Sequence, residues 1–260
     1  MTYDAQQRAR VRNPVLLISA VAWILLVVRP ESISRFAHCP ATSDEGVSFQ
    51  MMLAMNPPAS LAAGWVLMLA AMMSPVLMPP LCHIRARSFT HRRTRSIALF
   101  IAGYAAIWMV LGSVLLSLTL AVKSFASQSY LPAAGVAFIA FVWQFSPIKQ
   151  RCLNRCHGYT PLATFGVAAD FDALRFGISH GIWCAGSCWA LMLLPMLLPQ
   201  GHLVAMAIVT FWIFSERLEQ PMPPRWRWRT RGKALRILVA QARIRMSNVR
   251  PGPMPFLPIS

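Results

Sequence analysis

A run of metal-binding side chains is the clearest chemical feature of the sequence. His180, Cys184, Cys188 and Met192 follow one another at four-residue spacing. Because residues four apart lie on one face of an α-helix, this spacing aligns an imidazole, two thiols and a thioether. Thiolate and imidazole groups bind Cu(I) or Zn(II), and thioether sulfur shifts the preference towards copper. We therefore predict a transition-metal site at His180, Cys184 and Cys188, with copper favoured and zinc as the alternative.

A methionine-rich segment precedes this stripe in the sequence. Seven of the 15 methionines lie between Met51 and Met78. Met68 and Met72 are one helical turn apart, and Met73 follows directly. These three thioethers are predicted to face the cysteines as further soft ligands. The alternative is that they only pack, since methionine adapts to irregular interiors.

Pro75 interrupts the same apolar run. A proline inside a helix cannot donate to the carbonyl four residues earlier, here that of Ala71, so we expect a kink. We also expect Ser74 or a neighbouring helix to hydrogen-bond the freed backbone, because lipid offers no replacement partner.

A second cluster consists of Cys152, Cys156 and His157. We interpret it as a cytoplasmic acceptor for the soft metal, or as an ordinary loop. Haem attachment is not indicated, because that motif has two residues between its cysteines and this one has three. A disulfide between Cys184 and Cys188 is disfavoured too, because a pair four apart on a helix is poorly oriented and the cytoplasm is reducing.

The elements that position these residues follow from the composition. Of 260 residues, 56% are hydrophobic and 13% charged, yet the formal net charge is +17. A soluble domain has about a quarter of its residues charged, so a soluble enzyme is excluded, and a nucleic-acid binder would need a more polar surface. We predict an all-α, polytopic membrane protein with about six transmembrane helices, at Pro14–Val28, Ala59–Leu81, Ile97–Val122, Leu131–Phe145, Phe176–Leu198 and Leu203–Phe214.

The basic residues predict the orientation of these spans. With six spans, 22 of the 25 basic residues fall on the side that holds both termini. The positive-inside rule therefore places both termini in the cytoplasm. This gives a cytoplasmic N-terminus over residues 1–13, a transmembrane domain over 14–215 and a basic cytoplasmic tail over 216–260.

The tail is predicted to contact the membrane surface. Lys233 to Met246 has apolar residues on one side and basic residues on another, which is typical of an amphipathic interfacial helix, and Trp226 and Trp228 suit the headgroup region. We expect the bilayer, and anionic inner-leaflet lipids at the tail, as partners. Nucleic acid is not expected.

Three blocks of the sequence resemble a bacterial family of predicted metal-binding integral membrane proteins, the domain of unknown function 2182 family. The blocks run from Trp65 to Pro75, from Trp143 to Cys152 and from Gly177 to Trp189, and the resemblance extends to about Glu219. It implies metal binding and a bacterial inner membrane, but no reaction. After Glu216–Arg217 this chain continues with basic residues where members of the family often have a further apolar helix.

We predict a membrane protein that binds a soft metal for handling or transport, and not an enzyme, because no nucleophile or general base accompanies the carboxylates. The alternatives are a metal-free assembly partner of another membrane protein, or a thiol redox carrier using Cys184 and Cys188.

Overall fold

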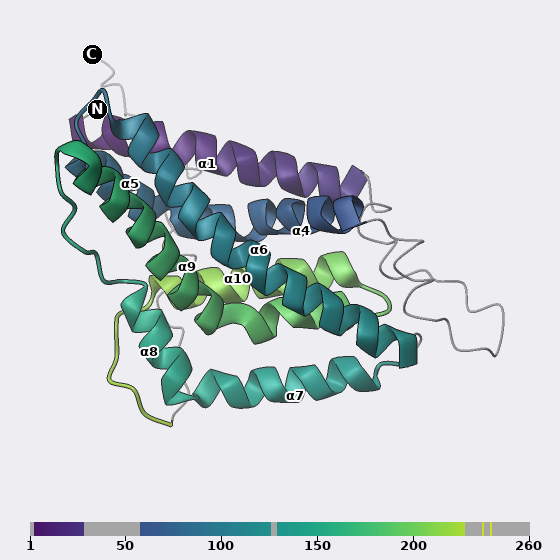
Figure 1. Ribbon diagram of the computed structural model, residues 1–260. Coiled ribbons are helices and arrows are strands. Elements are labelled where there is room, and N and C mark those ends of the chain that lie inside the picture. The colour runs from purple at the N-terminus through teal and green to yellow at the C-terminus, as the bar shows by residue number, and fades with distance from the viewer. Residues whose placement is uncertain (1–2, 29–57, 126–128, 227–235, 237–239, 241–260) are drawn as a thin grey trace, which may run out of the picture.

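The chain folds as a bundle of helices. The computed structural model describes residues 3–28, 58–125 and 129–226, together with residues 236 and 240, and all regular structure in these residues is helical. The helices are α1 (Tyr3–Val28), α4 (Pro58–Met73), the 3₁₀ turn η1 (Ser74–Leu77), α5 (Met78–Arg87), α6 (Arg93–Phe125), α7 (Leu131–Phe145), α8 (Pro147–Arg155), α9 (Gly166–Leu197) and α10 (His202–Leu218). The predicted all-α class is confirmed, and each predicted apolar stretch lies on a helix (Figure 1). The predicted tail helix at Lys233–Met246 lies outside the described residues.

Within the part of the chain that the structure describes, fewer than the predicted six helices meet the length and hydropathy expected of a membrane span. Four helical segments are long and apolar enough to cross a membrane: Ala9–Val28, Ala59–Arg87, Arg93–Phe125 and Gly166–Leu197. A fifth is added if α7 and α8, which meet at an angle of 69°, count as one bent span. Six spans are not confirmed, because α10 has only 17 residues, fewer than the roughly 20 that usually cross a bilayer.

At Pro75, where the sequence predicts a kink, the backbone forms a 3₁₀ turn. One 3₁₀ turn separates α4 from α5, but the segment from Ala59 to Arg87 continues through it as one span. Ser19 Oγ on α1 donates to the Ala71 carbonyl at 2.8 Å, and Ser74 Oγ donates to the Ala70 carbonyl at 2.5 Å. The carbonyl of Ala71, which the proline leaves free, is therefore bonded by the neighbouring helix α1, whereas Ser74 bonds the carbonyl one residue earlier.

The most extensive helix pair is α6 with α9, and glycines bring the two backbones together. A Cβ added at Gly177 would overlap the carbonyl of Phe100, and one at Gly103 would lie 2.7 Å from the carbonyl of Leu174. Any larger residue at either position would push the helices apart. This contact fixes which face of α9 points into the bundle.

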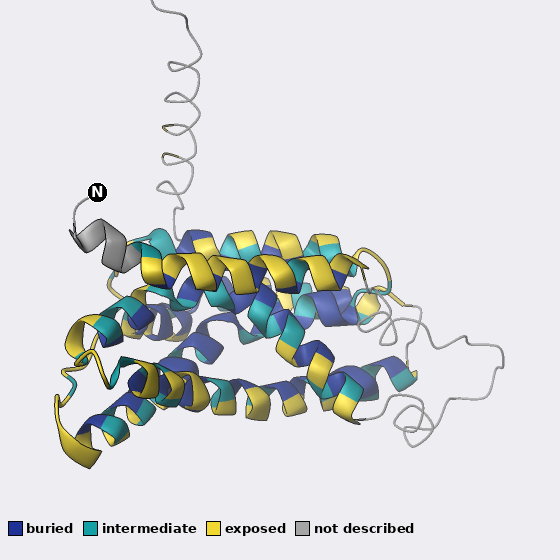
Figure 2. Cartoon of the chain, turned by 90° about the horizontal axis from the view of Figure 1, so that it is seen from above, coloured by how far each residue is buried: buried dark blue, intermediate teal, exposed yellow. Residues whose placement is uncertain are grey.

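The outer faces of the bundle are strongly apolar. Large side chains are exposed on several helices, for example Val28 (69%), Val110 (67%) and Ile208 (60%). Figure 2 shows exposed residues along the outward sides of the helices and buried residues towards the centre. Apolar surface of this extent is far larger than that of a typical soluble monomer.

Candidate metal centre

The centre of the bundle is a sulfur-rich cluster. Cys184 and Cys188 are 0% and 2% exposed, and both belong to the main buried core. The same core includes the predicted methionines and four further sulfur side chains: Met68, Met72, Met73, Cys156, Met192, Met196 and Met206. The cysteines and Met192 of α9 thus belong to the same buried core as the methionines of α4, although they are more than a hundred residues apart in the sequence; the sulfur side chains of this core are called the sulfur cluster below.

The two cysteines of α9 lie one turn apart as thiols, without a disulfide. Cys188 Sγ donates to the Cys184 carbonyl at 2.9 Å. Cys184 Sγ lies 3.4 Å from Tyr104 Oη on α6. The pair therefore has a polar partner on α6.

Trp65 positions the methionines of α4 against the bundle. Its Nε1 donates to the Trp108 carbonyl on α6 at 3.0 Å, and a Cβ at Gly112 would overlap the indole ring. Met68 follows Trp65 by three residues and so lies on nearly the same side of α4. Met68, Met72 and Met73 are at most 4% exposed. The tryptophan contact therefore directs the methionine-bearing side of α4 into the core.

Arg217 on α10 brings a positive charge to the thiols. The residue as a whole is partly exposed, but its guanidinium Nε is buried. The guanidinium interacts electrostatically with Cys156, Cys184 and Cys188, and its Nη2 lies 3.4 Å from Ser187 Oγ. A cation in this position favours a negatively charged sulfur centre. Arg217 is not among the predicted ligands, although a charge at the end of an apolar run is a signal for function.

A buried polar network supports Arg217 from the other side of α10. Lys149 Nζ pairs with Glu216 Oε2 at 2.9 Å, and Gln144 Nε2 donates to Glu216 Oε1 at 3.0 Å. Lys149 also donates to Gln144 Oε1. These residues connect α7, α8 and α10. Since Glu216 and Arg217 lie on α10, they belong to the bundle and not to a solvated tail.

His180 lies one turn before Cys184, in an aromatic environment. Its ring is 5.9 Å from the ring of Phe100, 6.1 Å from that of Tyr104 and 5.9 Å from that of Phe176. The side chain is buried, and Nε2 has no hydrogen-bond partner among the described residues. A buried nitrogen without a partner is costly unless it binds something.

The predicted acceptor residues have different partners in the structure. His157 Nδ1 lies 2.9 Å from the Leu153 carbonyl, and Nε2 lies 3.1 Å from the Arg217 carbonyl. Both nitrogens thus face backbone oxygens. Cys156 belongs to the sulfur cluster. Cys152 packs against Gly186 instead, so closely that a Cβ added at this glycine would lie 2.9 Å from Cys152 Sγ. Their role in metal binding stays a prediction.

The described residues limit which side chains could bind a metal at this centre. Within the described residues, no group of three or more His, Cys, Asp or Glu side chains is placed to hold a metal ion. A metal at this centre would therefore need thioether sulfur beside the two cysteines. That mixture suits Cu(I), which is soft, better than Zn(II), which usually takes four nitrogen, sulfur or carboxylate ligands.

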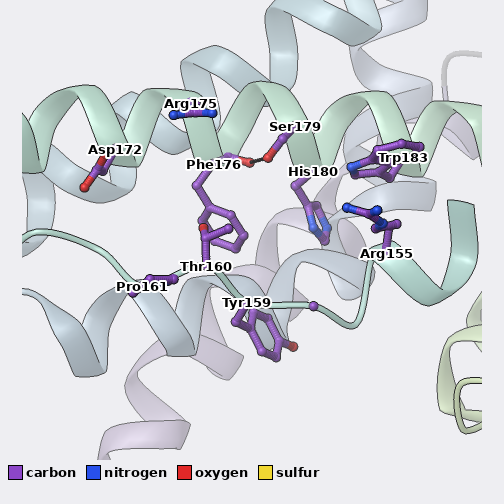
Figure 3. Close-up of a pocket in the computed structure, with 11 residues that line it drawn as sticks. Arg155, Tyr159, Thr160, Pro161, Asp172, Arg175, Phe176, Ser179, His180 and Trp183 are labelled. Carbon is purple, nitrogen blue, oxygen red and sulfur yellow. Dashed lines mark hydrogen bonds between the residues drawn. The ribbon is translucent and has the colours of Figure 1, made fainter.

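A cavity of about 490 Å³ opens beside His180. Its walls are the start of α9, the end of α8 and the segment between them. Figure 3 shows Phe176 and His180 pointing from α9 towards the segment that carries Tyr159, with Arg155 nearby. The other lining residues include Asp172, Arg175, Ser179 and Trp183.

Long apolar helices around buried thiols and thioethers define a helical bundle with a sulfur-rich core. A family model described as "PpoB2: Copper chaperone" matches residues 62–241, and the chain belongs to this family. The prediction of a metal-related family is thereby confirmed, while the designation as domain of unknown function 2182 stays a prediction. Neither a curated relative nor a solved structure matches the chain.

Proposed function

We propose that this protein is a membrane-embedded copper chaperone that holds Cu(I) as its cargo between Cys184 and Cys188 and the methionines of α4. The observation that carries the proposal is the burial of the cysteine pair in the same cluster as Met68, Met72 and Met73. The family description supports copper over zinc. The proposed role is binding and transfer, without catalysis.

The charge of the centre supports monovalent copper. Cu(I) bound by two thiolates has a net charge of −1, which is costly in an apolar interior unless a cation lies near. Arg217 is such a cation, since its guanidinium interacts with both thiols. Thioether ligands are neutral, so Met68, Met72 or Met73 can complete the coordination without adding charge.

The proposed location is a bacterial inner membrane, with six spans and both termini in the cytoplasm. The exposed apolar faces of the helices suit contact with lipid. In Figure 1, the first residues of α1 and the link from α5 to α6 lie at one end of the bundle, as do the starts of α6 and α9. Those regions are rich in arginine, as the positive-inside rule requires of a cytoplasmic side. α10 is short, but a modest mismatch is tolerated by local thinning of the bilayer.

The test is the copper content of purified protein loaded with Cu(I). We expect one bound copper in the wild type and loss of that copper when Cys184→Ser is combined with Cys188→Ser. Cys82→Ser is the matched control, since Cys82 is a partly exposed cysteine outside the sulfur cluster. X-ray absorption should show sulfur scattering that weakens when Met68, Met72 and Met73 are replaced by leucine. Unchanged stoichiometry in the double cysteine variant would reject the proposal, and a metal-free protein that retains a membrane partner would favour an assembly role.

A further inference from the structure

We propose that the cavity beside His180 is the port through which copper reaches and leaves the cysteine pair, and that its donor is a small anionic copper–thiolate complex. This inference rests on the proposed function. It assigns His180 Nε2 as the first protein ligand and gives the cavity a charge preference.

The position of His180 allows it to bind copper before Cys184 does. The residue lines the cavity, is 4% exposed, and has a buried Nε2 without a partner in the described part of the chain. An imidazole nitrogen that carries no proton binds metal through its lone pair. Cys184 is four residues further along the same face of α9, which corresponds to about 6 Å along the helix axis. Copper bound at His180 is therefore one helical turn from the first thiol.

Aromatic side chains surround His180 on the proposed route of copper from the cavity to Cys184. Phe100, Tyr104 and Phe176 surround the imidazole with ring-centroid distances of 5.9 to 6.1 Å. These rings give the imidazole an aromatic environment. Tyr104 also contacts Cys184 Sγ at 3.4 Å, so one side chain touches both the histidine and the first cysteine. A hydrated ion would be stripped of water here, whereas ligand exchange between soft donors needs no hydration shell.

The charges of the cavity argue against entry of a bare cation. Arg155 and Arg175 line it, and Asp172 is the acidic side chain among its lining residues. Asp172 Oδ2 accepts from the Ala163 backbone nitrogen at 2.9 Å, so this carboxylate also fixes the wall. Burial raises the pKa of Tyr159, which keeps its hydroxyl neutral at physiological pH. Two guanidinium groups against one carboxylate attract an anion and repel free Cu⁺.

The walls of the cavity are fixed by contacts, as a binding site requires. The ring of His83 stacks on Tyr159 with centroids 4.8 Å apart, and His83 Nε2 lies 3.2 Å from the Thr160 carbonyl. Arg155 lies over the Trp183 ring at 5.5 Å. The segment between α8 and α9 is thus held by contacts from α5 and α9, and the cavity is formed before any ligand arrives.

The transfer is a sequence of ligand exchanges without redox chemistry. The bond from copper to the carrier's thiolate breaks as the bond from copper to His180 Nε2 forms, and the carrier leaves with its electron pair. Copper then exchanges nitrogen for the sulfur of Cys184, while the freed His180 imidazole takes the thiol proton and passes it to the carrier's thiolate in the cavity, and the proton of Cys188 leaves by the same path when that thiol binds. Copper remains monovalent throughout, and delivery reverses these steps.

The test is the rate of copper loading, measured by stopped-flow absorption of the copper–thiolate band. Two probes are used: the anionic complex of Cu(I) with glutathione and the cationic complex of Cu(I) with acetonitrile. In His180→Phe, which keeps an aromatic ring, we expect loading from either probe to slow by about tenfold or more. In Arg155→Gln with Arg175→Gln, we expect slower loading from the glutathione complex only. Arg151→Gln is the matched control, because Arg151 is exposed on the same helix as Arg155 and does not line the cavity.

A measurement on the wild type makes the test independent of any variant. Salt screens charges, so loading from the anionic complex should slow as ionic strength rises, and loading from the cationic complex should not. Wild-type rates in His180→Phe, or equal salt dependence for both probes, would overturn the port. A wild-type protein that binds no copper would instead overturn the proposed function, so the two failures can be distinguished.

Discussion

Lys149 Nζ lies 2.9 Å from Glu216 Oε2, and this ion pair joins α8 to α10 with side chains that are only 3% and 6% exposed. Arg217 is the next residue along α10, and it lies beside the cysteines. A buried ion pair of this kind contributes less to stability than to selecting one packing arrangement of the helices that it joins. Here the arrangement it selects sets the position of the guanidinium at the sulfur cluster.

We predict that breaking this ion pair destabilises the protein strongly. Lys149→Met leaves the Glu216 carboxylate buried without its cation, which costs about 3–5 kcal/mol. Combining Lys149→Met with Glu216→Gln removes both charges and should recover much of that loss. The free energy of unfolding in detergent micelles, measured by denaturant titration, checks both values. Equal stability of the single and double variants would contradict a coupled pair.

We predict that Arg217 strengthens copper binding through its charge. Arg217→Gln should weaken the affinity for Cu(I) by about tenfold or more, where tenfold corresponds to about 1.4 kcal/mol. Arg217→Lys keeps the charge and should retain part of the affinity, although lysine cannot reproduce the planar guanidinium contacts. Competition with a chromophoric Cu(I) chelator gives the affinities. Arg225→Gln is the control, since Arg225 is exposed, and equal losses in both variants would point to a nonspecific charge effect.

We predict that Ser19 and Pro75 are energetically coupled. Ser19→Ala leaves the Ala71 carbonyl without the hydrogen bond that Ser19 Oγ donates at 2.8 Å, a loss of about 1–3 kcal/mol for a buried acceptor. Pro75→Ala restores a backbone N–H that can donate to the same carbonyl. A double-mutant cycle should therefore show a smaller cost of Ser19→Ala in the Pro75→Ala background. Additive effects would mean that the two groups do not share this carbonyl.

We predict that the contact between α6 and α9 does not tolerate a methyl group. In Gly177→Ala the new Cβ overlaps the Phe100 carbonyl, and we expect a loss of about 1–3 kcal/mol in unfolding free energy. Gly135→Ala is the matched control, because a Cβ there meets nothing within 4 Å, and alanine is favoured over glycine in a helix by about 1 kcal/mol. Thermal unfolding in detergent should therefore move in opposite directions for the two variants.

The helices were predictable because apolar runs of this length have few alternatives, and the stripe on α9 was predictable because helical spacing depends on the chain alone. The partner of the Ala71 carbonyl was predicted only as a kind of group, since nothing in the sequence selects Ser19. Arg217 and the pair of Lys149 with Glu216 were missed because their roles depend on how α10 packs against α8 and α9. His157 shows the converse, since its spacing from Cys156 suggests a ligand but both its nitrogens face backbone carbonyls.

The glycine contact of α9 with α6 limits where residues can be inserted into α9. Because Gly177 is fixed against Phe100, residues after it cannot turn about the axis of α9 to correct their direction. One residue inserted between Gly181 and Cys184 would rotate both cysteines by about 100° away from the methionines of α4. The number of residues in α9 between Gly177 and the cysteines is therefore fixed.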